Sequence, residues 1–239
     1  MPRWKTDAPV EIRAVEENLY SITTSFTAGS HGRKQLHSYY LVHPEGRFLF
    51  DGPDRSDFYK QNHAFFVRHG GIDKQIMSHG ADVSPASSYV EKTYRAPIYI
   101  HDADVEHAIR KRKGPITGSF STPHSVARGL EALPLPGHTP GFTVFLWSGS
   151  KRYLVSGDII AEDSGGWSAF ISTNPHQIGA DSLRRMMDVE CDLLLPSETA
   201  GDRLPPIPFS RAERETILRA VLRRVAKKYK TDVDLDSSA

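Results

Sequence analysis

A single histidine stands in the turn Pro136-Gly137-His138-Thr139-Pro140-Gly141, between two apolar stretches of the chain. Proline fixes the backbone angle φ and glycine permits a sharp bend or a close approach, so this turn holds His138 with little conformational freedom to lose. A histidine fixed in this way is typical of a metal ligand, whose ring must be oriented to bind the ion. The pattern therefore predicts a metal-binding role for His138. The alternative is a tight turn that only displays an exposed histidine.

Three further side chains that can bind a metal follow short apolar segments. They are His79 after Ile72–Met77, Asp158 after Tyr153–Val155, and Glu198 after Leu193–Leu195. Two histidines and a carboxylate suit one zinc ion with an open position for water, and they also suit one non-haem iron ion. We therefore expect one zinc or iron ion per chain. The alternative is no ion, with His79 and His138 hydrogen-bonded to Asp158 in a polar cluster.

The order and spacing of these residues resemble the metallo-β-lactamase superfamily over about Val10 to Arg203. The segment Phe48–Gly52 resembles the family's strand that ends in Asp-Thr-Gly. The family's first motif is His-x-His-x-Asp-His, and His79 matches its first histidine. His138 matches the histidine of the family's second motif, and Asp158 matches the aspartate that bridges the two metals. Glu198 stands in place of the family's last histidine. The resemblance implies an α/β (α+β) fold, a four-layer αββα sandwich.

The sequence departs from the first motif at three positions. Ala81, Val83 and Ser84 stand where the family has His, Asp and His. The remaining residues cannot build a two-metal site, and the carboxylate that would activate a metal-bound water is replaced by Val83. Asp82 either turns into the site or caps the helix expected from Pro85 to Tyr94. The sequence therefore assigns no catalytic base.

The resemblance implies a mononuclear metal-dependent hydrolase of a small ester, thioester or phosphoester. The alternative is a metal-free pseudoenzyme that acts as a binding or scaffold protein. In a hydrolase, the loop between Asp158 and Asp181 would lie beside the ion, so Trp167, Phe170 and His176 are candidate substrate-binding residues. The alternative is that the two aromatic side chains cover the edge of the core and that His176 is a surface residue.

Composition limits the partners. The family includes nucleases, and basic runs occur at Arg110–Lys113 and between Arg219 and Lys230, but the formal net charge of the 239-residue chain is only +1. Because that charge argues against a nucleic-acid partner, we expect a small-molecule substrate. No segment approaches the length of a membrane span, and Cys191 is the only cysteine. A cytoplasmic protein without a membrane partner is therefore expected. The sequence does not specify an oligomeric state.

The chain is predicted to form one main domain with short extensions. The expected units are an N-terminal tail at 1–9, a metallo-β-lactamase-like domain at 10–209, a docked amphipathic helix at 210–230 and a flexible tail at 231–239. The docked helix is predicted from a capping box, in which Glu213 follows Ser210 by three residues. Other helices are expected at Arg55–His69, Pro85–Tyr94, Asp104–Arg112 and Asp181–Val189, and early strands at Glu11–Val15, Leu19–Thr23, Ser38–His43 and Arg47–Phe50.

Overall fold

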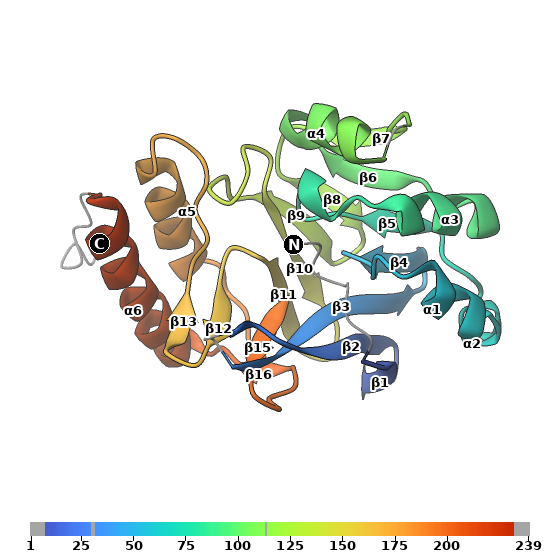
Figure 1. The fold of residues 1–239 in the computed structure, drawn as a ribbon, viewed down its shortest axis with the longest axis horizontal. Helices are drawn as coiled ribbons and strands as arrows, with labels where there is room; N and C mark the ends of the chain where they lie inside the picture. The colour runs from blue at the N-terminus through green and yellow to red at the C-terminus, as the bar shows by residue number, and fades with distance from the viewer. Residues whose placement is uncertain (1–7, 30–31, 113, 232–239) are drawn as a thin grey trace.

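A computed structural model describes residues 8–29, 32–112 and 114–231, and its largest feature is a pair of sheets with helices outside them (Figure 1). The first sheet has the strand order β1-β2-β3-β4-β5-β6-β7, with β15 paired to the N-terminal part of β3. Its strands are Val10–Glu16 (β1), Leu19–Thr27 (β2), Arg33–His43 (β3), Gly46–Phe50 (β4), Lys74–Ile76 (β5), Ile98–His101 (β6), Gly118–Phe120 (β7) and Glu198–Ala200 (β15). Strands β1 to β4 are antiparallel, and β4 to β7 are parallel.

The second sheet has the strand order β16-β14-β11-β10-β9-β8. Its strands are His124–Ala127 (β8), Leu130–Pro134 (β9), Thr143–Ser148 (β10), Arg152–Gly157 (β11), Leu193–Pro196 (β14) and Ile207–Pro208 (β16). Only β11 and β14 pair in parallel. A separate hairpin of β12 (Ala161–Asp163) and β13 (Gly166–Ser168) follows β11.

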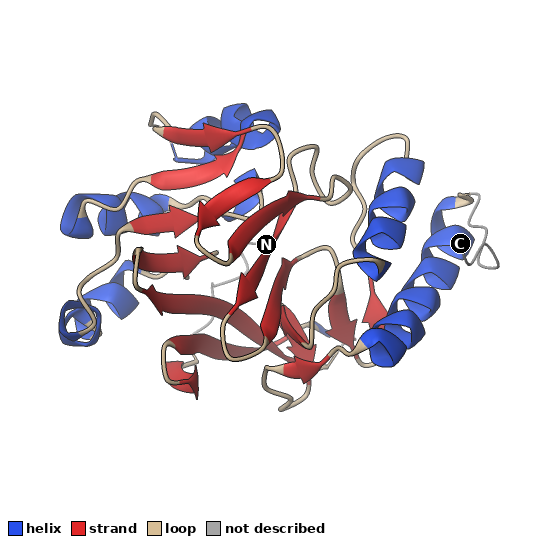
Figure 2. Ribbon diagram, turned by 180° about the vertical axis from the view of Figure 1, so that it is seen from behind, coloured by secondary structure: helices blue, strands red, loops and turns tan. Residues whose placement is uncertain are grey.

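The helices lie on the two outer faces of this pair of sheets (Figures 1 and 2). They are Ser56–Gln61 (α1), His63–Arg68 (α2), Pro85–Tyr94 (α3), Asp102–Arg112 (α4), Gln177–Met187 (α5) and Arg211–Tyr229 (α6), with a short 3-10 turn at Gly80–Asp82 (η2). Helices α1 to α4 cover the first sheet, and α5 and α6 cover the second. Within the described residues, no helix is both long and apolar enough to cross a membrane.

Side chains that alternate along the strands separate the core into layers, because successive residues of a strand point to opposite faces of its sheet. Phe50 on β4 and Phe145 on β10 meet between the sheets, with ring centroids 5.5 Å apart. Their neighbours Leu49 and Val144 point outward, Leu49 toward the cluster that contains the α2 residue Phe66 and Val144 toward that of α5 and α6. The layers are therefore helix, sheet, sheet and helix, which confirms the expected αββα sandwich.

Several helix predictions are confirmed and one is wrong. Helix α3 spans Pro85–Tyr94 as expected, and α6 begins with the expected capping box, since Ser210 N donates to a Glu213 carboxylate oxygen at 2.9 Å. The helix expected at Arg55–His69 is two helices, with a break at Asn62. The side chain of Asn62 donates to the carbonyl oxygen of Phe58 at 2.9 Å, and such local bonds compete with a continuous helix.

The capping role considered for Asp82 is wrong. Ser84 is the N-cap of α3, and its backbone nitrogen donates to Ser87 Oγ at 3.2 Å. Asp82 lies earlier, in η2. The tails expected at 1–9 and 231–239 lie largely outside the described residues, while α6 buries Leu218 and Val221 in the same cluster as α5.

Candidate metal centre

The candidate ligands lie where the strands end at one edge of the sandwich. His79 follows β5, His138 lies between β9 and β10, and Asp158 follows β11. The two sheets are joined at this edge because Thr143 N, at the start of β10, donates to Ser78 O at 2.9 Å. The topology therefore brings together side chains from distant parts of the sequence.

Three of the four predicted ligands converge. One ligand atom each from His79, His138 and Asp158 lies within 4.8 Å of the others. Asp158 Oδ2 is 3.3 Å from His79 Nε2 and 3.8 Å from His138 Nε2, and the two imidazole centroids are 4.6 Å apart. His79 and Asp158 are buried, and His138 is partly exposed. The three side chains thus form a compact group at this edge of the sandwich, and His138 is the member that solvent can reach.

His138 is oriented by the backbone of a neighbouring loop. Its Nδ1 donates to the carbonyl oxygen of Phe170 at 3.2 Å, which leaves the lone pair of Nε2 facing Asp158. Burial, followed by the charge of His79, lowers the pKa of His138, so the ring is kept neutral. A neutral imidazole with one nitrogen held by a carbonyl is the usual state of a histidine that ligates a metal.

His79 is held differently. Its Nδ1 accepts a hydrogen bond from Ala81 N at 3.2 Å, and its Nε2 is buried without a hydrogen-bond partner among the described residues. That Nε2 lies 3.3 Å from an oxygen of Asp82 and 3.3 Å from one of Asp158. Burial lowers the pKa of His79, but the negative charges of Asp82 and Asp158 outweigh it and raise the pKa well above its ordinary value.

Asp158 is fixed by its other oxygen. Ser197 Oγ donates to Asp158 Oδ1 at 2.5 Å and also contacts the carbonyl oxygen of Gly157 at 2.8 Å. Because Oδ1 is occupied in this way, Oδ2 is the oxygen that faces both histidines. Ser197 follows β14 directly and is buried.

Glu198 does not join the cluster. It is the residue after Ser197, and successive side chains of an extended segment point to opposite sides. The structure therefore turns Glu198 away from Asp158 and toward β3, where it forms an ion pair with Lys34 at 2.9 Å. Asp82 is the carboxylate that does turn into the site.

Asp104, which the sequence analysis did not select, connects the two histidine loops. Its carboxylate accepts hydrogen bonds from Gly80 N at 2.9 Å, Thr139 Oγ1 at 2.5 Å and Gly141 N at 2.9 Å. Gly80 follows His79, and the other two donors lie in the His138 turn. A Cβ atom at Gly141 would lie 3.0 Å from the Asp104 carboxyl group, a tight contact, so glycine favours this close approach.

A second buried carboxylate, Asp51, holds the start of the His79 loop. Asp51 Oδ1 accepts from Ser78 N at 2.7 Å. Its burial, together with the charge of Asp82, raises the pKa of Asp51 to about 7. Asp51 belongs to the Phe48–Gly52 segment that carries part of the family resemblance, so the sequence did mark this position, although not its contact.

The donor set fits one ion. Metal–ligand distances of about 2.0 to 2.3 Å allow a single ion to bridge ligand atoms up to about 4.6 Å apart, close to the span seen here. The buried Nε2 of His79 makes no well-aligned hydrogen bond, although oxygens of Asp82 and Asp158 lie 3.3 Å from it, and this arrangement fits an atom that would face an ion. Ala81 and Val83 offer no ligand atom for a second ion.

The three predicted substrate-binding residues take different positions. Phe170 has an exposed side chain beside the cluster, and its carbonyl oxygen orients His138. Trp167 lies on β13, with the guanidinium of Arg203 5.9 Å from its ring centroid. His176 precedes α5 and packs on the ring of Tyr229 at 4.3 Å, so it contacts α6 and not His138.

No family model and no curated protein matches the chain by sequence. Solved structures are similar over almost its whole length. A metallo-beta-lactamase from Pontibacter korlensis is 16% identical, with a TM-score of 0.69, covering 90% of this chain and 99% of its own. The metallo-beta-lactamase FIM-1 from Pseudomonas aeruginosa, in its mono-zinc form, is 15% identical, with a TM-score of 0.69, covering 95% and 98%.

A third similar structure is the metal-soaked Flv1 flavodiiron core from Synechocystis. It is 12% identical, with a TM-score of 0.65, covering 91% of this chain and 62% of its own. At such identities the likeness establishes the architecture alone. The chain therefore has the metallo-β-lactamase fold, as the order of its candidate ligands predicts.

Proposed function

We propose that this protein is a mononuclear metal-dependent hydrolase of a small ester, thioester or phosphoester. The observation that carries the proposal is the convergence of ligand atoms from His79, His138 and Asp158 within 4.8 Å. The mono-zinc form of FIM-1 supports it, because a similar architecture holds one zinc ion there, and a second similar structure is described as a metal-soaked flavodiiron core.

In this proposal the neighbouring residues orient the metal ligands, and a further carboxylate lies beside them. A zinc or iron ion bound by them would act as a Lewis acid and lower the pKa of a bound water. His138 presents Nε2 because the Phe170 carbonyl takes its Nδ1 proton, and Asp158 presents Oδ2 because Ser197 holds Oδ1. Asp82, whose Oδ2 lies 3.3 Å from His79 Nε2, is the carboxylate in position to accept a proton.

The proposal is tested by metal content and turnover. Protein purified without chelator is expected to carry about one equivalent of zinc or iron, and to hydrolyse 4-nitrophenyl esters only with the ion. His138→Ala should lose the ion. Glu198→Gln is the matched control and should keep it, because Glu198 faces Lys34. Less than about a tenth of an equivalent after incubation with zinc and with iron would contradict the proposal.

One observation favours a second function, a metal-free binding or scaffold protein. Because His79 Nδ1 accepts from Ala81 N, the neutral ring carries its proton on Nε2, between the carboxyl groups of Asp82 and Asp158. In that state the residues form a buried polar cluster that needs no metal. The two functions predict different effects of zinc on thermal stability. An ion that binds the folded chain raises its melting temperature, whereas a metal-free polar cluster gains no stability from added zinc.

A further inference from the structure

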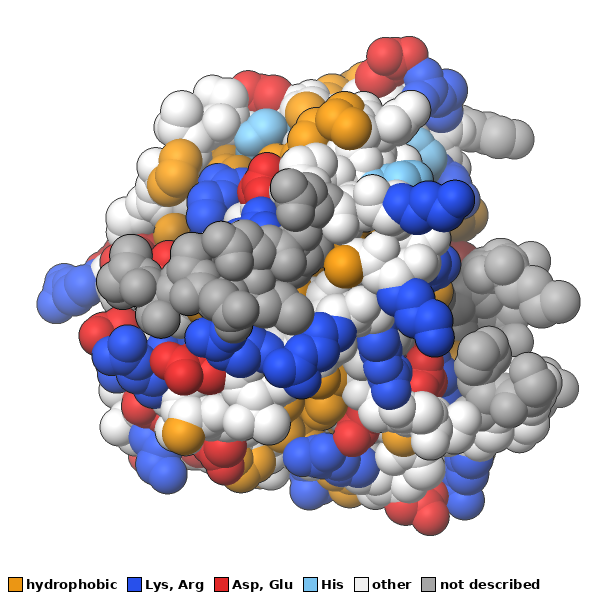
Figure 3. Space-filling view, turned by 90° about the vertical axis from the view of Figure 1, so that its left-hand side faces the viewer, with side chains coloured by type: hydrophobic (Ala, Val, Ile, Leu, Met, Phe, Trp, Pro, Cys, Tyr) orange, Lys and Arg blue, Asp and Glu red, His pale blue; other side chains and the backbone are white. Residues whose placement is uncertain are grey.

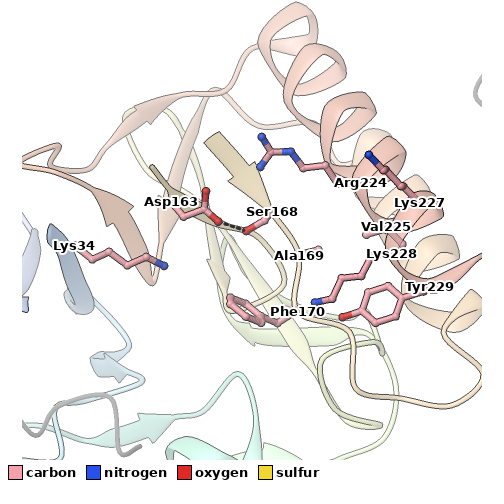
Figure 4. Close-up of a pocket in the computed structure, with 10 residues that line it drawn as sticks. All are labelled: Lys34, Asp163, Ser168, Ala169, Phe170, Arg224, Val225, Lys227, Lys228 and Tyr229. Carbon is pink, nitrogen blue, oxygen red and sulfur yellow. Dashed lines mark hydrogen bonds between the residues drawn. The ribbon is translucent and has the colours of Figure 1, made fainter. Parts of the chain in front are cut away.

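A pocket of about 590 Å³ lies between the β12–β13 hairpin, the segment that follows it and the C-terminal end of α6 (Figure 4). This volume is within the range of small-molecule sites. Much of its lining is apolar, from Ala169, Phe170, Val225 and Tyr229. Phe170 is 47% exposed, although an aromatic ring of this size is normally covered. The pocket is therefore suited to the apolar body of a ligand.

Cations surround this apolar surface. Lys34, Arg224, Lys227 and Lys228 line the pocket, and Asp163 is the single carboxylate among the lining residues. Figure 3 shows several Lys and Arg side chains on the side of the molecule where α6 lies. The net charge of the lining residues is thus positive, and a pocket with a positive net charge attracts an anion.

The cations are not equally available. Lys34 is paired with Glu198, and Arg224 donates to the backbone carbonyl oxygens of Gly165 and Trp167, which do not neutralise its charge. Lys228 Nζ lies 4.8 Å from the ring centroid of Tyr229, on the side of the pocket that Phe170 faces (Figure 4). Within the described part of the chain, no carboxylate forms an ion pair with Lys227 or Lys228. Lys228 is therefore the cation best placed to meet a ligand.

The pocket adjoins the candidate metal centre at two points. The side chain of Phe170 lines the pocket, and its carbonyl oxygen accepts from His138 Nδ1. On the other side, the Lys34 partner Glu198 follows Ser197, which holds Asp158. Phe170 therefore separates a molecule in the pocket from His138, the most exposed member of the cluster.

We propose that this pocket binds the anionic end of the substrate, so that the substrate is an amphipathic ester or thioester with an apolar body and a carboxylate or phosphate group. That the bond to be hydrolysed lies on the side of His138 rests on the proposed function. The binding of an anion by the pocket does not depend on that function. The apolar lining holds the body of the ligand, and Lys228 with Arg224 holds its charge.

Binding is tested by titration calorimetry of the full chain after its metal has been removed with chelator and the chelator has been dialysed away, so that neither an ion nor the chelator interferes. 4-Phenylbutyrate should bind about tenfold more tightly than 4-phenylbutan-1-ol, which has the same apolar body without the charge. 4-Phenylbutyl phosphate, which has a similar apolar body, is the second arm, and whichever anion binds more tightly identifies the preferred charged group. Equal affinity of the acid and the alcohol would overturn the assignment.

A pair of variants on α6 locates the site. Lys228→Gln should weaken 4-phenylbutyrate binding about three- to fivefold, as expected for one partly solvated charge contact. Arg223→Gln removes the same charge from the same helix at an exposed position that does not line the pocket, and it should leave the affinity unchanged. Equal losses in both variants would mean that the anion senses only the general charge of α6, and the assignment would fall.

Turnover separates this inference from the proposed function. Metal-loaded protein should hydrolyse the 4-nitrophenyl monoester of glutaric acid with a kcat/KM about fivefold above that of 4-nitrophenyl butyrate, and Lys228→Gln should remove the preference through KM. Selective anion binding without any hydrolysis would refute the hydrolase and support the pocket. Hydrolysis without preference for the anionic ester, together with equal binding of acid and alcohol, would support the hydrolase and refute the pocket.

Discussion

The two sides of the candidate centre differ in what holds their side chains. On the side of His138 and Asp158, each potential ligand has one atom fixed by a neighbour, Phe170 O or Ser197 Oγ, and another turned into the cluster. On the side of the His79 loop, His79 joins the cluster, but positions at which the family has further ligands have structural roles instead. The first side is arranged as a binding site, and the second is arranged as part of the core.

The structural roles on the second side are specific. Val83 is 2% exposed and packs in the cluster that contains Met77 and Ile98. Ser84 caps α3. Glu198, which follows Ser197 on the Asp158 side, also has a structural role because it pairs with Lys34. The residues that replace the family's ligands therefore make contacts of their own. Substituting a metal ligand at such a position would remove a contact that stabilises the fold.

The largest effect is expected from Asp104, which joins the two sides. Asp104→Ala would leave the Gly80 and Gly141 amides and the Thr139 hydroxyl without their acceptor, at about 1 to 3 kcal/mol for each unsatisfied group. We expect unfolding in urea to show a loss of about 4 kcal/mol.

The conservative change Asp104→Asn keeps one acceptor oxygen and separates positioning from folding. It should cost less stability but still weaken metal binding about 10- to 100-fold, because it loosens both histidine loops. Competition with a chromophoric chelator measures that affinity. A folded Asp104→Asn protein with unchanged metal affinity would show that the two loops do not depend on this carboxylate.

A somewhat smaller effect is expected at Val83. Val83→Asp would place a carboxylate where the family has one, but in an apolar cluster without a partner, so we expect it to cost about 3 kcal/mol of stability. Ala81→Asp, two residues earlier at a half-buried position, is the control and should cost about 1 kcal/mol or less. If Val83→Asp were as stable as the parent in urea, the His79 side would be an adaptable site and not part of the core.

Glu198 should matter for stability and not for the ion. Glu198→Gln leaves the charge of Lys34, whose side chain is 7% exposed, without its partner, and we expect a loss of about 2 kcal/mol. Replacing both residues by methionine should recover most of that loss, since a buried pair can often be replaced by apolar side chains. A Glu198→Gln protein that kept its stability but lost its metal would restore Glu198 as a ligand.

The family resemblance implied the sandwich, and the three converging residues could be predicted for a physical reason. Short apolar runs mark buried strands, and polar side chains directly after them must emerge at a sheet edge. The same reasoning failed for Glu198, because it located the end of the strand without determining which side the next residue faces. A shift of one residue in an extended segment exchanges Ser197, which contacts Asp158, for Glu198, which contacts Lys34.

Contacts made through the backbone left no signal in the sequence. Asp104 binds two amide groups and a hydroxyl that lie 24 to 37 residues away, and any residue type can provide an amide. The cationic pocket was missed for a similar reason, since Lys34 and Lys228 come from opposite ends of the chain. The hairpin β12–β13 lacks the apolar alternation that predicts strands.

The smallest expected effect concerns the N-terminal caps of two helices. One is the cap of α3, which follows the His79 loop, and the other is the cap of α6. In α3, Ser84 N donates to the uncharged Ser87 Oγ, whereas in α6, Ser210 donates to the carboxylate of Glu213. Hydrogen bonds from the Ser210 hydroxyl and amide lower the pKa of Glu213 below 4.5. A carboxyl group with a lowered pKa stabilises the fold above its ordinary pKa, and the contribution disappears as the pH falls through the lowered value.

The two caps should therefore respond differently to acid. Glu213→Gln should lower the melting temperature slightly at neutral pH, and the difference from the parent should shrink as the pH falls below 4.5, because protonation removes the charge in the parent as well. Ser87→Ala should cost about 1 kcal/mol at every pH at which the protein folds, since no group of that cap titrates. Thermal unfolding of the three proteins over a pH series measures both effects. A Glu213→Gln difference that stays constant through the acid range would show that its carboxylate charge does not support α6, and that the two caps act alike.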